Sequence, residues 1–84
     1  MLLDWLENRH ENIKEELWFK HGGKATVDAY LNVSNDLHNY GIWQTTETNL
    51  SGTNSQYIYC GSQNYFQPSS FLKVTGTPIL IQSN

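Results

Sequence analysis

The chain has 84 residues, with five basic and eight acidic side chains and a formal net charge of −3. A chain of this length is expected to form one domain, spanning 1–84, that buries roughly 60–65% of its unfolded surface. The absence of a basic excess excludes nucleic acid and anionic membranes as the main partners. No apolar run approaches the ~20 residues of a membrane span, and the first residues lack the features of a signal peptide. We therefore expect a cytoplasmic protein.

Residues 2–20 have the apolar spacing of an amphipathic helix. Intervals of three and four residues place the apolar side chains on one side and most of the charges on the other. The apolar set is Leu3, Leu6, Ile13 and Leu17. Trp18 falls on the charged side, so we expect the helix to loosen there and Trp18 to fold back onto the core, with an exposed Trp18 as the alternative.

Residues 25–40 fit two patterns. The alternation from Ala25 to Val33 is typical of a half-buried strand. A helix that begins near Thr26 and ends before Gly41 accounts for more of the segment. The sequence therefore predicts a second short helix, and a strand is the alternative.

Residues 42–82 favour strands. The segments 42–48 and 56–61 are expected to form a hairpin with a long loop, and 71–74 and 78–82 are expected to add two more strands. No internal repeat is evident. The expected fold is therefore an α+β domain, in which two helices are followed by a small antiparallel meander of about four strands.

Side chains that ligate metals or act as nucleophiles lack the spacing that such sites need. Glu7 and His10 have the i, i+3 spacing of a helical carboxylate–imidazole pair, but the chain has no second copy of it. His21, His38 and Cys60 do not match the spacings of zinc sites. A Cys60–His38 nucleophilic pair has no activating signature around it. We therefore expect no metal, no cofactor and no enzymatic activity.

Neutral aromatic side chains give the best functional lead. Between Gln44 and Ser70, sixteen of twenty-seven residues are Asn, Gln, Ser or Thr, with tyrosines among them. In an extended segment, Tyr57 and Tyr59 share one face and Ile58 shares the other with Cys60. Rigid aromatic rings beside adaptable amides and hydroxyls suit a binding surface. The alternative is that cross-strand tyrosines only cover a small sheet.

From these features we expect a small non-enzymatic protein that binds and modulates or inhibits a protein partner. Compact inhibitors made by phages and mobile elements provide an analogy of type only. The alternative is a module that binds a saccharide or a nucleotide-like ligand, stacked on Trp43. A homo-oligomer formed through the 78–82 strand is also open, if that strand lies at a sheet edge. The predicted binding residues are Trp43, Tyr57, Tyr59 and Tyr65 on the sheet and Glu7, Glu11 and Glu15 on the helix.

Overall fold

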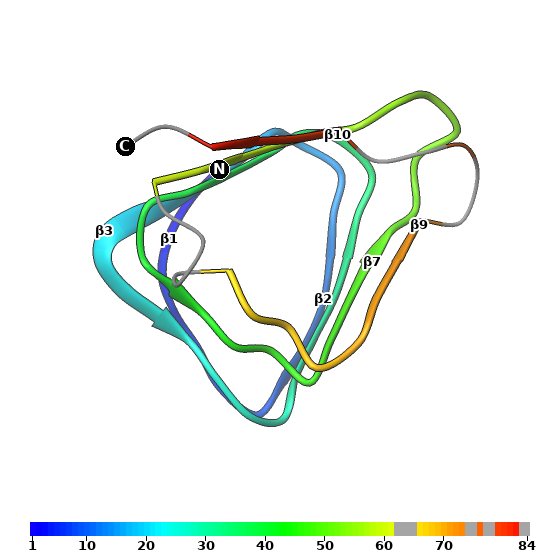
Figure 1. Ribbon diagram of the computed structural model, residues 1–84. Helices are drawn as coiled ribbons and strands as arrows, with labels where there is room; N and C mark the ends of the chain where they lie inside the picture. The colour runs from blue at the N-terminus through cyan, green and yellow to red at the C-terminus, as the bar shows by residue number, and fades with distance from the viewer. Residues whose placement is uncertain (62–65, 74–75, 77–78, 83–84) are drawn as a thin grey trace.

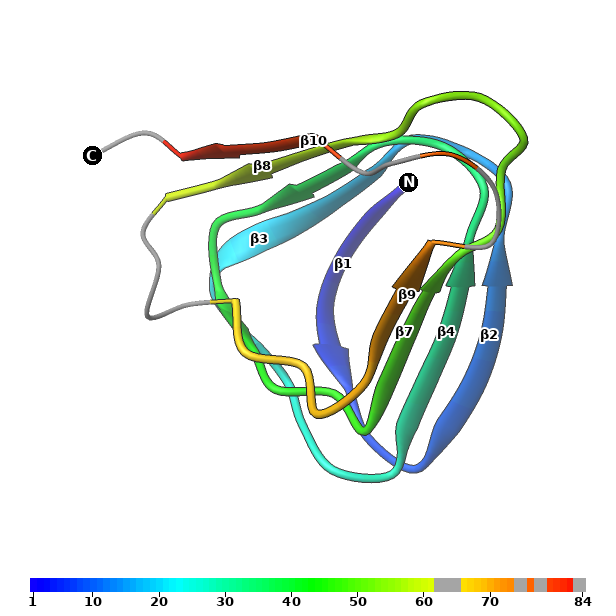
Figure 2. The ribbon, with the colours of Figure 1, turned by 45° about the vertical axis from the view of Figure 1, so that its right-hand side comes forward.

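The computed structural model describes residues 1–61, 66–73, 76 and 79–82, and it shows a three-sided β-solenoid (Figure 1). The chain winds around a central axis, and each turn stacks on the one before it (Figure 2). All strand pairs among the described residues are parallel. The described part of the chain contains strands and turns, and no helix.

Strands alternate with corners and loops of different lengths along the described chain. In order, the strands are β1 (Leu2–Leu6), β2 (Arg9–Ile13), β3 (Leu17–Ala25), β4 (Ala29–Val33), β5 (Leu37–Asn39), β6 (Ile42–Trp43), β7 (Glu47–Leu50), β8 (Tyr57–Cys60), β9 (Phe71–Lys73) and β10 (Ile79–Gln82).

Two sheets form the three sides of the solenoid. The four-stranded sheet has the order β2-β4-β7-β9 and makes one side. The six-stranded sheet has the order β1-β3-β5-β8-β10, with β6 also paired to β3. The long strand β3 bends around a corner, because its first residues pair with β5 and its last residues pair with β6. This sheet therefore covers the other two sides (Figure 1).

Inward-facing side chains stack in columns along the axis. Leu17, Leu37 and Ile58 occupy equivalent positions of successive turns, and all are fully buried. The parallel register places each of these apolar side chains over another one in the next turn, so β3, β5 and β8 together build one continuous column of the core. A second column runs along the four-stranded sheet and consists of Ile13, Val33 and Leu50.

Charged residues take some of the inner positions of the outermost strands in the four-stranded sheet. In β2, Arg9 forms an ion pair with Glu11, at positions in register with buried residues of β4. In β9, Lys73 donates to Gly52 O at 2.6 Å and to Gln56 Oε1 at 2.8 Å. Terminal repeats of a solenoid have one face without a neighbouring repeat, so polar groups suit these positions.

The predicted N-terminal helix over residues 2–20 is wrong, because this segment forms β1, β2 and the start of β3. Its apolar side chains do enter the core, and Leu6, Ile13 and Leu17 are buried. They reach it because the chain turns a corner at Asn8, which has a φ of 55°. Asparagine tolerates this left-handed conformation better than most residues. A corner between two strands thus produces an apolar spacing that resembles a helical one.

The predicted helix over residues 25–40 is also wrong, and the strand alternative describes most of the segment. Ala29 and Val33, at the ends of β4, are both buried. Val27 breaks the alternation and is 67% exposed, because the chain turns at Asp28 with a φ of 60°. The Asp28 N–H donates to Thr46 Oγ1 at 2.9 Å, which ties this corner to the next turn.

The predicted antiparallel meander, and with it the α+β class, is wrong as well. The strand positions around 57–60, 71–73 and 79–82 are close to those expected, but their pairing differs. The strand β8 pairs with β5 and β10, which lie one turn before and one turn after it. The expected hairpin between 42–48 and 56–61 does not form, since β6 pairs with β3 and β7 pairs with β4 and β9.

Candidate functional site

The outer face of the six-stranded sheet carries a stack of aromatic rings. Trp18, His38 and Tyr59 are in register on β3, β5 and β8. The Trp18 and His38 ring centroids lie 3.7 Å apart, with an interplanar angle of 2°. The His38 and Tyr59 centroids lie 4.4 Å apart at 8°. Neighbouring strands lie about 4.8 Å apart, which is close to the spacing that stacked rings need.

Two further tyrosines widen this stack. The centroids of Tyr40 and Trp18 lie 6.1 Å apart, as do those of Tyr57 and Tyr59. We call these five side chains the aromatic face. Trp18 is 41% exposed and Tyr57 is 38% exposed, whereas His38 lies almost buried between its neighbours. The stacked rings therefore cover one another's faces and leave other parts open to a partner.

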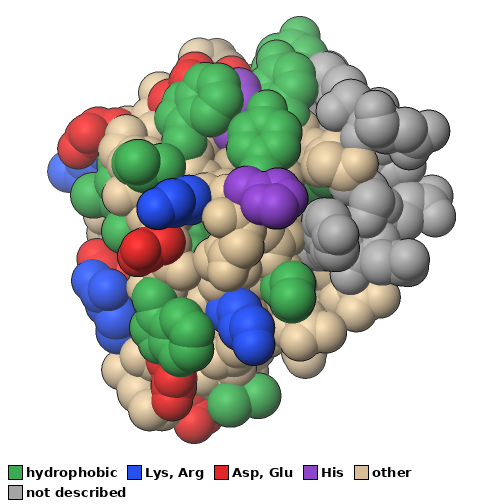
Figure 3. All heavy atoms as spheres, turned by 90° about the vertical axis from the view of Figure 1, so that its left-hand side faces the viewer, with side chains coloured by type: hydrophobic (Ala, Val, Ile, Leu, Met, Phe, Trp, Pro, Cys, Tyr) green, Lys and Arg blue, Asp and Glu red, His purple; other side chains and the backbone are tan. Residues whose placement is uncertain are grey.

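Glu16 fixes the orientation of the outermost ring. Its Oε1 accepts a hydrogen bond of 2.8 Å from the indole N–H of Trp18. The same oxygen lies 3.2 Å from His38 Nε2, although outside hydrogen-bond geometry. Leu2, in register with Trp18 on β1, is 69% exposed and extends the apolar surface. On the side of the molecule that includes β1 and β3, hydrophobic side chains lie beside histidine, with acidic and basic groups around them (Figure 3).

The expectation that Trp18 folds back onto the core is wrong, and its exposed alternative holds. Side chains alternate between the inside and the outside along β3. Leu17 and Phe19 are buried, so Trp18 between them points outward.

Trp43 lies in the core, where a partner cannot contact it. Its side chain is fully buried, and its indole N–H donates to Thr48 Oγ1 at 2.9 Å. Its ring packs edge-on against Phe19, with centroids 5.1 Å apart. Among the other predicted sheet contacts, Tyr57 and Tyr59 do lie together on the aromatic face, and Tyr65 lies outside the described residues.

The three predicted acidic contacts do not form a strip, because the helix that was to carry them is absent. Glu7 lies in the exposed corner between β1 and β2. Glu11 lies within β2 and pairs with Arg9. Glu15 lies in a different corner, with Oε2 3.8 Å from the amino group of Met1.

Trp18 and His38, two members of the aromatic face, were not predicted as binding residues. A weak signal for the stack exists in the sequence. The strands carry the triplets Leu-Trp-Phe, Leu-His-Asn and Ile-Tyr-Cys, each with a ring between two inward positions. This signal becomes informative only when the parallel register is known, because the three triplets are far apart in the chain.

A catalytic pair of Cys60 and His38 does not form. Cys60 is buried and in register with Asn39, whereas His38 stacks on the outer face of the sheet. In the part of the chain that the structure describes, no cluster of three or more His, Cys, Asp and Glu side chains is placed to hold a metal ion.

Burial raises the pKa of the Cys60 thiol from 9.0 to about 11, against a smaller opposing effect of its hydrogen bond with Asn39. We therefore expect Cys60 to resist iodoacetamide at pH 8 in the native protein and to react readily in urea. The folded state holds this proton more tightly, so the thiol's contribution to stability is complete below pH 9 and is lost as the pH rises toward 11. Labelling followed by mass spectrometry, and unfolding curves at pH 8 and 10.5, measure both effects. Equal labelling of native and unfolded protein would contradict the first expectation.

Comparison with family models, curated proteins and solved structures finds no match for this chain. The described residues include no helix long and apolar enough to cross a membrane. Function is therefore inferred from the geometry of the surface.

Proposed function

We propose that the protein is a small non-enzymatic binding protein whose aromatic face docks onto a protein partner. The observation that supports this most strongly is the stack of Trp18, His38 and Tyr59, which leaves Trp18 substantially exposed at one end. Tryptophan and tyrosine are enriched among the residues that dominate protein–protein binding energies. Exposed aromatic side chains gathered on one face are typical of an interaction site.

Rigidity favours this surface as an interface. The rings are held by mutual stacking, and the Trp18 indole is also held by Glu16. Side chains that are already ordered lose little conformational entropy when a partner binds. The backbone beneath them is equally constrained, because each strand of the stack pairs on both sides.

The partner that suits this face is a protein with a complementary apolar pocket. The formal charge of −3 disfavours a polyanionic partner such as nucleic acid. By covering part of the partner's surface, a compact domain modulates or inhibits that partner, which is the role proposed here. Self-association through the 78–82 strand stays a separate prediction. The strand β10 is last in the order of its sheet, as that prediction requires, and Pro78 lies outside the described residues.

The test replaces two exposed members of the aromatic face, Trp18→Ala and Tyr57→Ala. Tagged wild-type protein first captures its partner from host extract, and the purified partner is then titrated against each variant by biolayer interferometry. We expect the double variant to bind at least about 30-fold more weakly, which corresponds to the ~2 kcal/mol typical of a hot-spot residue.

Tyr30→Ala is the matched control. Tyr30 lies on the four-stranded sheet, stacked on His10 with ring centroids 4.5 Å apart, so this change also removes a ring from an outer stack. We expect it to leave the affinity unchanged. Undiminished binding by a folded Trp18→Ala/Tyr57→Ala variant, or an equal loss in Tyr30→Ala, would show that the aromatic face is not the interface.

A further inference from the structure

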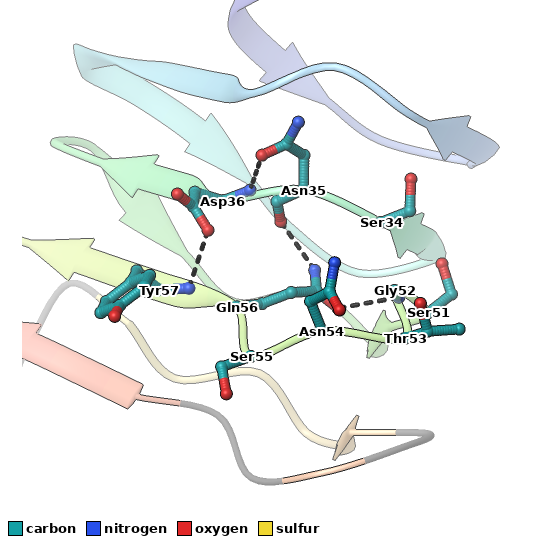
Figure 4. Close-up of a pocket in the computed structure, with 10 residues that line it drawn as sticks. All are labelled: Ser34, Asn35, Asp36, Ser51, Gly52, Thr53, Asn54, Ser55, Gln56 and Tyr57. Carbon is teal, nitrogen blue, oxygen red and sulfur yellow. Dashed lines mark hydrogen bonds between the residues drawn. The ribbon is translucent and has the colours of Figure 1, made fainter.

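A cavity of about 560 Å³ lies at one corner of the solenoid (Figure 4). It is lined by two connecting loops, 34–36 between β4 and β5 and 51–56 between β7 and β8, together with Tyr57 at the start of β8. Its volume is within the range of about 300–1,000 Å³ that is usual for small-molecule sites. Hydroxyl and amide groups make up most of its lining.

Gln56 holds the two loops together beneath the cavity. Its side chain is almost fully buried, and Nε2 donates to Val33 O and Asn35 O, both at 2.7 Å. Its Oε1 accepts the Gly52 N–H at 2.8 Å. A Cβ atom at Gly52 would lie 2.5 Å from Ser34 O, so only glycine allows the loops to approach this closely. The cavity therefore has a fixed floor.

A second set of bonds positions Tyr57 at the side of the cavity. Asp36 Oδ1 accepts the backbone N–H of Tyr57 at 2.9 Å, and the Asp36 N–H donates to Asn35 Oδ1 at 2.8 Å. The Tyr57 side chain remains 38% exposed. It thus places an aromatic ring next to a polar cavity (Figure 4).

The rim of the cavity offers polar groups that are open to solvent. The side chains of Ser51, Thr53, Asn54 and Ser55 are exposed, and none forms a hydrogen bond with another described residue. Hydroxyls both donate and accept hydrogen bonds, and amides do so through separate atoms. Among the lining residues Asp36 carries the only charge. The nearby Lys73 ammonium already donates to Gly52 O and Gln56 Oε1 of the floor, so two of its donors are used within the protein.

We infer that this corner cavity binds a neutral saccharide. The Tyr57 ring contacts the apolar face of a sugar, and the hydroxyls and amides of loop 51–55 exchange hydrogen bonds with the sugar hydroxyls. Lipid acyl chains lack polar partners for these groups, and a nucleotide would bring its phosphates close to the Asp36 carboxylate. The site differs from the protein-docking surface proposed above and shares only Tyr57 with it.

Titration of ¹⁵N-labelled protein with maltotriose, cellotriose and chitotriose tests this inference. We expect at least one trisaccharide to cause saturable shifts in the backbone amides of 34–36 and 51–57. Asn54→Ala/Ser55→Ala is expected to weaken that binding at least fivefold. The matched control, Gln44→Ala/Ser69→Ala, removes an exposed amide and an exposed hydroxyl at another corner and is expected to change nothing.

Three results would overturn the inference. They are the absence of saturable shifts with all three trisaccharides, equal weakening in the control variant, and tighter binding of glucose 6-phosphate than of glucose. Failure here is distinguishable from failure of the docking proposal. Asn54→Ala/Ser55→Ala is expected to retain the protein partner, and Trp18→Ala is expected to retain the trisaccharide.

Discussion

Replacing Trp43 with alanine is expected to lower the free energy of unfolding by about 3–5 kcal/mol. The side chain is fully buried and is the largest in the core. Its ring packs edge-on against Phe19 and lies 6.2 Å, between centroids, from Phe66 of the following turn. Alanine would leave a cavity between turns that cannot collapse, because paired strands hold the backbone on both sides of it.

The loss of Trp43 is also expected to disrupt a polar contact. The indole N–H bonds to Thr48 Oγ1, which itself lies 2.6 Å from Thr45 Oγ1. Truncation leaves these buried hydroxyls with one partner fewer, which adds to the cost of the cavity. A domain of this size has about 5–15 kcal/mol of stability in total, so a loss of about 3–5 kcal/mol removes a large share of it.

Urea denaturation followed by circular dichroism measures the effect. Trp5→Ala is the matched control, since Trp5 is 53% exposed on β1, and we expect it to change stability by no more than about 0.5 kcal/mol. Trp43→Phe should fall between the two variants, because it keeps most of the ring and loses the hydrogen bond. If Trp43→Ala cost no more than the ~0.5 kcal/mol expected for Trp5→Ala, Trp43 could not occupy the centre of the core.

The inward-facing residues could be predicted from the sequence better than the fold could. Leu6, Ile13 and Leu17 were expected in the core and are buried. Their helical spacing arises because Asn8 turns the chain between β1 and β2, which changes the phase of the alternation. In a solenoid every strand faces the same interior, so a pattern that continues across a corner does not indicate one continuous element.

The repeat itself is hidden by uneven corners. Leu17, Leu37, Ile58 and Leu80 mark equivalent positions, and the interval between them lengthens by one residue at each turn. A search at a fixed period therefore aligns different parts of successive turns. Solenoid repeats are usually detected by a constant period, and this chain conserves the geometry of its strands while it varies the length of its connections.

The candidate site was predictable only within one strand. Alternation along β8 places Tyr57 and Tyr59 on the same face, and this prediction agrees with the structure. Trp18 and His38 join them through parallel pairing across turns, which spacing along the chain does not reveal. Trp43 was predicted on the binding surface but lies in the core. Its position depends on the pairing of β6 with β3, which its neighbours in the sequence do not reveal.

Gly41→Ala is expected to lower the free energy of unfolding by about 3 kcal/mol, the upper part of the usual range for overpacking. A Cβ atom at Gly41 would lie 2.5 Å from Gly23 O and 2.8 Å from Lys20 O. Both are backbone atoms of β3, in the turn beneath, so neither can rotate away. The same Cβ would lie 3.0 Å from Phe19 Cδ2, inside the core.

Gly22→Ala separates crowding from backbone conformation. Gly22 lies in the same corner with a φ of +85°, and a Cβ atom there would meet nothing within 4 Å. Its expected cost is the left-handed penalty alone, about 1–2 kcal/mol. Gly41 has no positive φ, so conformational preference by itself makes Gly22→Ala the more damaging change. Close contact between consecutive turns predicts the opposite, with a larger loss in the free energy of unfolding for Gly41→Ala than for Gly22→Ala. Denaturation curves for the two variants measure both losses. A larger loss for Gly22→Ala would contradict the close stacking of turns at Gly41.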